Sequence, residues 1–101
     1  MEIKKVDDTK VEFFPEGEID FYNSDEIYKK LLNYYNKNYQ QIEINFSKVN
    51  NIDASGIGKL IAFNNKLKDE GIKLIIKDIE NKTVKKAFEL LGFNKIVDIK
   101  E

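Results

Sequence analysis

The chain has 101 residues, and its 17 basic and 18 acidic side chains give a formal net charge of −1 at pH 7. This length predicts one domain over residues 1–101, and a balanced charge without a basic block argues against nucleic-acid binding by phosphate neutralisation. The absence of cysteine and histidine excludes disulfides, thiolate catalysis and zinc sites built on those residues, and we expect no cofactor. Because no apolar run is long enough to span a membrane and no signal core opens the chain, we expect a cytoplasmic protein without membrane insertion.

Two strands separated by a turn are predicted at the N-terminus. Residues 7–9 have the Asp-Asp-Thr composition of a turn. From Val11 to Ile19 alternate residues share one face of a second strand, which the pattern predicts as half-buried. Pro15 lies within this strand and cannot donate a ladder hydrogen bond, so we expect an edge or a bulge there.

A first helix is predicted to begin at Asn23. Asn23 and Glu26 have the spacing of a capping box, in which two side chains satisfy free backbone amides at the helix start. The apolar stripe that follows consists of Ile27, Leu31 and Tyr34 or Tyr35. We expect these tyrosines and Tyr39 to pack on the sheet, whereas an exposed tyrosine patch would indicate an interface.

Two later segments, residues 42–46 and 72–77, alternate apolar side chains with polar or lysine-bearing positions. This pattern predicts strands with one buried face, so helices should cover only one side of the sheet. Between them, apolar residues recur at helical spacing, and Gly71 supplies a stop signal. The apolar positions of this second helix are Ile57, Leu60, Ile61 and Leu67.

A third helix is predicted from about Asn81, followed by a short strand within residues 95–99. Gly92 is expected in the left-handed conformation that ends helices, with Phe93 making the accompanying apolar contact. The expected apolar face of this helix consists of Val84, Ala87, Phe88 and Leu91. With right-handed crossovers, the order of elements predicts an α/β fold, a mixed four- to five-stranded sheet with helices mainly on one face.

The best functional lead is Ser55, because it lies where the strand pattern gives way to the helical one. A helix should begin at or beside it, and helix N-terminal amides and the helix dipole favour an added anion. The alternative is structural, since serine is among the preferred N-cap residues.

Two carboxylates and a lysine are expected near Ser55. Asp20 and Asp53 each follow a strand, and the carboxyl ends of parallel strands meet at one edge of a sheet. We therefore predict a surface site rather than a buried pocket; the alternative is that both aspartates serve only as turn formers. Lys59 lies one helical turn after Ser55 and either contacts a phosphate there or remains a solvated surface lysine.

Three motifs in order carry a resemblance to a known family. They are the strand-end Gly-Glu-Ile-Asp of residues 17–20, the Asp-Ala-Ser-Gly of residues 53–56 and the Leu-Leu-Gly-Phe of residues 90–93. Together they resemble the STAS domain, which includes anti-sigma factor antagonists and the cytoplasmic domains of sulfate transporters. In the bacterial antagonists the serine directly before the glycine is phosphorylated, and here that residue is Ser55. Many members carry a second hydroxyl at the position of Ala54, so this chain has one acceptor in the turn.

The resemblance implies a phosphorylation-switched anti-sigma factor antagonist. Unmodified, it would bind an anti-sigma factor serine kinase and free the sigma factor; phosphorylation of Ser55 would abolish binding, and a PP2C-type phosphatase would restore it. Gly56 is expected to leave the amides beside Ser55 uncovered for a partner. The residues expected to bind the partner are Asp20, Asp53, Ala54, Gly56, Ile57 and Lys59.

Two other functions are alternatives to this one. The chain would alternatively be a STAS scaffold or a regulatory subunit of a stress-sensing or lipid-transport complex that does not act on a sigma factor. An enzyme is not expected, because no histidine is present to activate Ser55. A serine-lysine dyad would need a buried Lys59 within hydrogen-bond reach.

Overall fold

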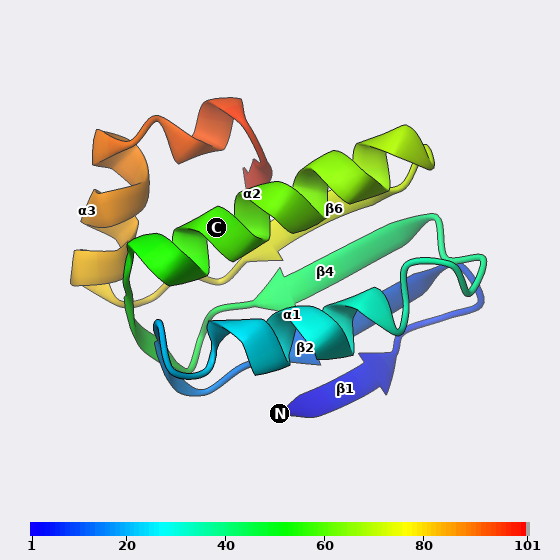
Figure 1. Cartoon of the computed structure of the whole chain (residues 1–101), viewed down its shortest axis with the longest axis horizontal. Helices are drawn as coiled ribbons and strands as arrows, with labels where there is room; N and C mark the ends of the chain where they lie inside the picture. Colours follow the sequence, from blue (N-terminus) through cyan, green and yellow to red (C-terminus); the bar gives the residue numbers. More distant parts are fainter. Residues whose placement is uncertain (101) are drawn as a thin grey trace.

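The computed structural model describes residues 1–100. Within them the main sheet consists of β1 (Glu2–Lys5), β2 (Lys10–Phe14), β4 (Gln41–Asn45), β6 (Lys73–Lys77) and β7 (Asp98–Lys100). The strand order is β1-β2-β4-β6-β7 (Figure 1). β1 runs antiparallel to β2, whereas β2, β4, β6 and β7 are mutually parallel, so the predicted mixed sheet is confirmed.

A smaller parallel ladder lies apart from the main sheet. It pairs β3 (Gly17–Ile19) with β5 (Val49–Ile52), and Ile19 lies opposite Ile52. β5 was not predicted, because its two central residues are exposed asparagines and the strand shows no alternating pattern. The ladder matters for function, because both of its strands end where Asp20 and Asp53 begin the connections to the helices.

The expected continuous strand from Val11 to Ile19 is wrong in its second half. β2 ends at Phe14, and the next residue, Pro15, has no N–H with which to continue a ladder. Gly17 then turns the chain into β3 with a φ of 74°, a conformation that glycine adopts without strain. The proline therefore marks a break between two sheets rather than a bulge within one.

The helices pack mainly on one face of the main sheet, as predicted. α1 (Ser24–Leu32) and α2 (Ala54–Asp69) lie across this face, α3 (Lys82–Leu90) packs against β5, and the 3₁₀ helix η1 (Phe93–Lys95) follows (Figure 1). Within residues 1–100, no helix combines the length and the apolar character needed to cross a membrane. The side chains buried between sheet and helices include Val11, Phe13, Ile42, Ile44, Phe63, Leu67, Leu74 and Ile76.

The opposite face of the main sheet carries a charged network. The ammonium group of Lys77 lies 3.0 Å from Glu12 Oε2 and 3.4 Å from Glu43 Oε1, and both glutamates are only 8% exposed. Burial alone lowers the pKa of Lys77, but the hydrogen bond to Glu12 and the charges of both glutamates outweigh this effect, so its pKa lies above the ordinary 10.5. Because Lys77 pairs with both glutamates, this face of the sheet carries charged side chains without leaving either carboxylate unpaired.

The start of α1 differs from the predicted capping box. Asn23 occupies the N-cap position, but its side chain makes no capping hydrogen bond. Instead its Oδ1 accepts from the backbone amide of Asp20 at 2.8 Å, and its Nδ2 donates to the carbonyl of Glu18 at 2.7 Å. Asn23 therefore fixes the loop before the helix. The tyrosines after α1 pack against the core as expected, and Tyr34 meets Phe13 edge-to-face with ring centroids 5.1 Å apart.

The C-terminal segment follows the prediction at the end of α3. Gly92 has a φ of 62°, and the ring of Phe93 stacks on Phe88 at a centroid distance of 4.6 Å. Leu91 was wrongly expected on the buried face, because it follows α3 as its C-cap and is 56% exposed. The expected strand within residues 95–99 is displaced, since η1 runs to Lys95 and β7 begins at Asp98.

Candidate functional site

Helix α2 begins with Asp53, and not Ser55, as its N-cap. Asp53 has an extended backbone, and its Oδ1 accepts a hydrogen bond from the amide of Gly56 at 3.0 Å. Ser55 is the second helical residue and is partly exposed. The alternative interpretation of Ser55 as the capping residue is therefore wrong, and its hydroxyl is not needed for the cap.

Asp53 also joins the two connections that follow the small ladder. Its Oδ2 accepts from the amide of Phe21 at 3.0 Å, and its own amide donates to the carbonyl of Ile19 at 3.1 Å. One carboxylate thus holds the start of α2 and the loop after β3 in fixed relation. The structure brings together Asp20, Asp53 and Ser55 at the carboxyl ends of paired parallel strands, as predicted, although these strands are β3 and β5 rather than strands of the main sheet.

The loop after β3 is tightly hydrogen-bonded around Asp20. Asp20 Oδ1 accepts from the amides of Tyr22 at 2.9 Å and Asn23 at 3.2 Å. The Asn23 side chain and Asp53 fix the rest of the loop, so Asp20 acts in this turn as a structural acceptor. These bonds tie the loop to the starts of α1 and α2.

This loop presents two aromatic side chains to solvent. Phe21 is 71% exposed and Tyr22 is 90% exposed, and their rings meet edge-to-face with centroids 5.6 Å apart. Exposed aromatic residues that contribute nothing to a core are typical of binding surfaces. They were missed in the sequence, where the available signal was an adjacent aromatic pair between turn-forming Asp20 and Asn23.

Gly56 has a packing role that the sequence analysis did not anticipate, and its predicted part in partner binding stays a prediction. It is buried, and a Cβ at this position would lie 2.8 Å from Ile19 Cγ2, 2.8 Å from Ile52 Cγ1 and 3.0 Å from the Ile19 carbonyl oxygen. Glycine is required here because α2 packs directly on the small ladder. Ala54 is exposed beside Ser55, whereas Ile57 is half-buried against the core.

Lys59 is engaged by helix α1. Its ammonium group lies 2.7 Å from Asp25 Oδ1 and 5.2 Å from the ring centroid of Tyr28. The hydrogen bond from Lys59 and its positive charge lower the pKa of Asp25 below the ordinary 3.8. Lys59 is therefore neither a freely solvated lysine nor the buried base that a serine-lysine dyad would need.

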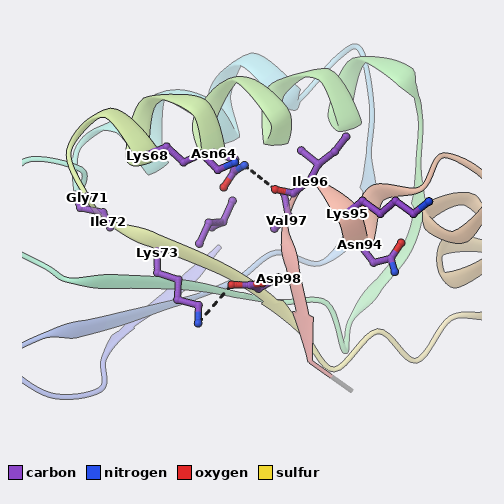
Figure 2. A pocket seen from close by; sticks show the side chains of 11 residues that line it. Asn64, Lys68, Gly71, Ile72, Lys73, Asn94, Lys95, Ile96, Val97 and Asp98 are labelled. Carbon is purple, nitrogen blue, oxygen red and sulfur yellow. Dashed lines mark hydrogen bonds and ion pairs between the residues drawn. The ribbon is translucent and has the colours of Figure 1, made fainter.

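Two depressions in the surface lie away from Ser55. One, of about 430 Å³, lies between the C-terminal half of α2, the start of β6 and residues 94–98. Figure 2 shows the side chain of Asn64 donating to the Ile96 carbonyl on one side of it and Lys73 paired with Asp98 on the other. The second, of about 520 Å³, is lined by residues of α3 and the C-terminal segment. Neither is lined by Ser55, Asp20 or Asp53, which is consistent with the predicted surface site.

Comparison with known proteins identifies the family. The STAS domain model matches residues 1–101. An anti-sigma-B factor antagonist of Listeria monocytogenes is 26% identical over 100 residues, covering 99% of this chain and 87% of that protein.

Several solved structures share the fold. The anti-sigma factor antagonist SpoIIAA in its unphosphorylated form has a TM-score of 0.71 at 21% identity, covering 88% of this chain and 81% of that one. The phosphorylated form of the Bacillus cell fate determinant SpoIIAA has a TM-score of 0.74 at 20% identity, covering 97% and 88%. A sulfate transporter family protein from Wolinella succinogenes has a TM-score of 0.81 at 19% identity, covering 96% and 80%. With the family model matching along its whole length, the chain belongs to the STAS domain family.

Proposed function

We propose that this chain is an anti-sigma factor antagonist that binds a serine-kinase anti-sigma factor and is released when Ser55 is phosphorylated. The observation that carries the proposal is the position of Ser55, a partly exposed hydroxyl that is free of the capping role and lies beside a rigid loop with two exposed aromatic rings. The antagonist relatives and the phosphorylated SpoIIAA structure support it.

Phe21 and Tyr22 are the proposed anchors for the partner. Their loop is ordered by hydrogen bonds to Asp20, Asn23 and Asp53, so little conformational entropy is lost when the rings are buried. Aromatic side chains held in this way supply much of the binding energy at many interfaces. The partner should therefore offer an apolar cleft for the two rings, with its kinase active site next to Ser55.

Phosphorylation would reverse the binding by placing charge at this contact. The γ-phosphoryl group of ATP would pass to Ser55 Oγ, forming an O–P bond as ADP leaves and the hydroxyl proton is lost. The phosphate adds about −1.5 to −2 charges, and burying them beside Asp20 and Asp53 is opposed by desolvation and repulsion. The fold should persist because Asp53 remains the cap of α2. A PP2C-type phosphatase would hydrolyse the phosphate and restore binding.

The test combines phosphate mapping with binding measurements. The chain is mixed with its candidate kinase and ATP, and mass spectrometry should locate the phosphate at Ser55; Ser55→Ala should remain unmodified. Among the other serines, Ser24 is 3% exposed and therefore inaccessible, whereas Ser47→Ala is a suitable control because Ser47 is partly exposed. A phosphate at Ser47 with Ser55→Ala still fully modified would end the proposal.

Binding should depend on the aromatic loop and on charge at Ser55. Ser55→Asp, and separately the pair Phe21→Ser and Tyr22→Ser, should each weaken kinase binding by at least about tenfold, equivalent to about 1.4 kcal/mol. Leu90→Ser is the matched control, since Leu90 is an apolar side chain of similar exposure, 77%, at the end of α3. Equal losses for the loop variants and for Leu90→Ser would contradict the assignment of the interface.

The second candidate function is a domain of a scaffold or of a stress-sensing or lipid-transport complex. The observation in its favour is the fold shared with the Wolinella sulfate transporter family protein. Copurification of the chain with a membrane-embedded transporter, without release of any sigma factor, would favour this alternative.

A further inference from the structure

The segments around Ser55 are acidic and contain one lysine. Residues 16–28 and 49–65, which form β3, β5 and the adjoining starts of α1 and α2, contain six carboxylates and one base, Lys59. The chain contains no arginine, so no guanidinium can substitute. Two neighbouring lysines are paired elsewhere: Lys48, before β5, with Glu16 at 3.3 Å, and Lys30, in the second half of α1, with Glu26 at 3.6 Å. A third, Lys29, lies one turn after Asp25 on α1 and acts on that carboxylate through its charge.

The backbone donors at the start of α2 are partly occupied. Asp53 Oδ1 holds the amide of Gly56, and the Asp53 carbonyl holds the amide of Ile57 at 3.0 Å. A phosphate on Ser55 would therefore meet fewer free amides than an uncapped helix offers. Its charge has to be balanced largely by a side chain.

Lys59 is placed to reach that phosphate. Residues four apart on a helix have Cβ atoms about 5–6 Å apart, and helical side chains lean toward the N-terminus, so the long side chain of Lys59 extends over the turn that holds Ser55. In the unmodified protein its ammonium group is bound to Asp25 instead. Both side chains are well exposed, 41% for Lys59 and 74% for Asp25, and such a pair is weak enough to exchange.

We propose that Lys59 is a latch with two positions: it binds Asp25 while Ser55 is unmodified and transfers to the phosphate when Ser55 is phosphorylated, which releases Asp25. A phosphate dianion attracts the ammonium group more strongly than a single, largely exposed carboxylate does. The freed Asp25 stays in the first turn of α1, where the helix dipole favours a negative charge, so α1 remains folded. The phosphorylated surface then presents, in addition to the phosphate, an Asp25 carboxylate that has lost its hydrogen bond from Lys59 and keeps only the nearby charge of Lys29.

This inference rests on the proposed function only in requiring a phosphate at Ser55, and it is tested without the kinase. The chain is produced with phosphoserine encoded at position 55, and the phosphate is titrated by ³¹P NMR. The midpoint should be lower by about 0.3–0.7 pH units in this chain than in the same chain carrying Lys59→Met, the size expected for one partly exposed ion pair. Lys66→Met is the matched control, because Lys66 lies on the same helix over the ring of Tyr35 at 4.8 Å.

A second readout follows the released partner. At about pH 7.5, where the phosphate is largely a dianion, phosphorylation of Ser55 should move the carboxyl ¹³C signal of Asp25 toward the position that it has in the unmodified Lys59→Met chain. Lys66→Met should leave the ³¹P midpoint and the Asp25 signal where they are in the parent. Equal ³¹P midpoints in the parent and Lys59→Met chains, or an Asp25 signal that phosphate does not move in this direction, would overturn the latch. Failure of the proposed function would appear separately, as the absence of kinase binding or of enzymatic phosphorylation.

Discussion

The close packing of Gly56 leads to a prediction about two glycines in the same helix. Gly56→Ala adds a methyl group that would lie 2.8 Å from two isoleucine carbons and 3.0 Å from the carbonyl oxygen of Ile19. None of these neighbours moves easily, because both isoleucines are buried and β-branched and the oxygen belongs to β3. Gly58→Ala, one half-turn further along α2, meets nothing within 4 Å.

The two substitutions should change stability in opposite directions. Overpacking a core costs about 1–3 kcal/mol, whereas replacing glycine by alanine in a helix contributes up to about 1 kcal/mol. Gly56→Ala should therefore be destabilised by a net of about 1–2 kcal/mol, and Gly58→Ala should be stabilised by about 0.5–1 kcal/mol.

Urea unfolding followed by circular dichroism measures both free energies of unfolding on the same scale. The comparison controls for helix propensity, because the chemical change is identical and only the surroundings differ. If Gly56→Ala proved as stable as the parent chain, α2 would not pack on the small ladder as described. Equal destabilisation at both positions would show that packing is not the cause.

Four further substitutions test the site and the sheet. Ser55→Ala should alter the free energy of unfolding by less than about 0.5 kcal/mol, since Ser55 is not the cap. Asp53→Ala should destabilise the chain by about 1–2 kcal/mol, and Asp53→Asn by less. Urea unfolding compares these three variants, and a larger loss for Ser55→Ala than for Asp53→Ala would assign the cap to Ser55. Lys77→Met should destabilise by about 3 kcal/mol, because it leaves two nearly buried carboxylates without their cation. Since the pKa of Lys77 is raised in the folded chain, its contribution to the free energy of unfolding should be complete below pH 10.5 and should be lost as the pH rises through the folded-state pKa. Unfolding measured at a series of rising pH values should show this loss of stability in the parent chain and not in Lys77→Met.

The main sheet and its covering helices could be predicted from the sequence because their patterns are strong. Residues 42–46 and 72–77 alternate, and the predicted apolar side chains of β4 and β6 are buried against the helices. Glu43, Asn45 and Ile75, which alternate with them, are buried as well, and the alternation did not predict this. The end of α3 was equally readable, since Gly92 and Phe93 carry a specific termination signal. Local chemistry and long-range packing agree at these positions.

The small ladder and the details of the site could not be read in this way. β5 is four residues long, and its pairing with β3 depends on contacts between distant segments. The sequence analysis considered Ser55 as the cap and Asp53 as a turn former, whereas Asp53 occupies the N-cap position and accepts the amide of Gly56. Aspartate and serine are both favoured at this position, so residue preference alone does not separate them. The contact of Gly56 with Ile19 and the pairing of Lys59 with Asp25 likewise join residues that lie more than about 30 positions apart in the sequence.

The separation of the small ladder from the main sheet has a mechanical consequence. A force applied to the loop of Phe21 acts first on β3 and β5, the paired strands next to it. Pro15 has no N–H, so backbone hydrogen bonding is interrupted between β3 and β2. α2 packs on both β5 and β6 and so couples the two parts. The end of the molecule that carries the proposed binding loop can therefore move while the main sheet keeps its register, and α2 is the element through which such a movement would reach the main sheet.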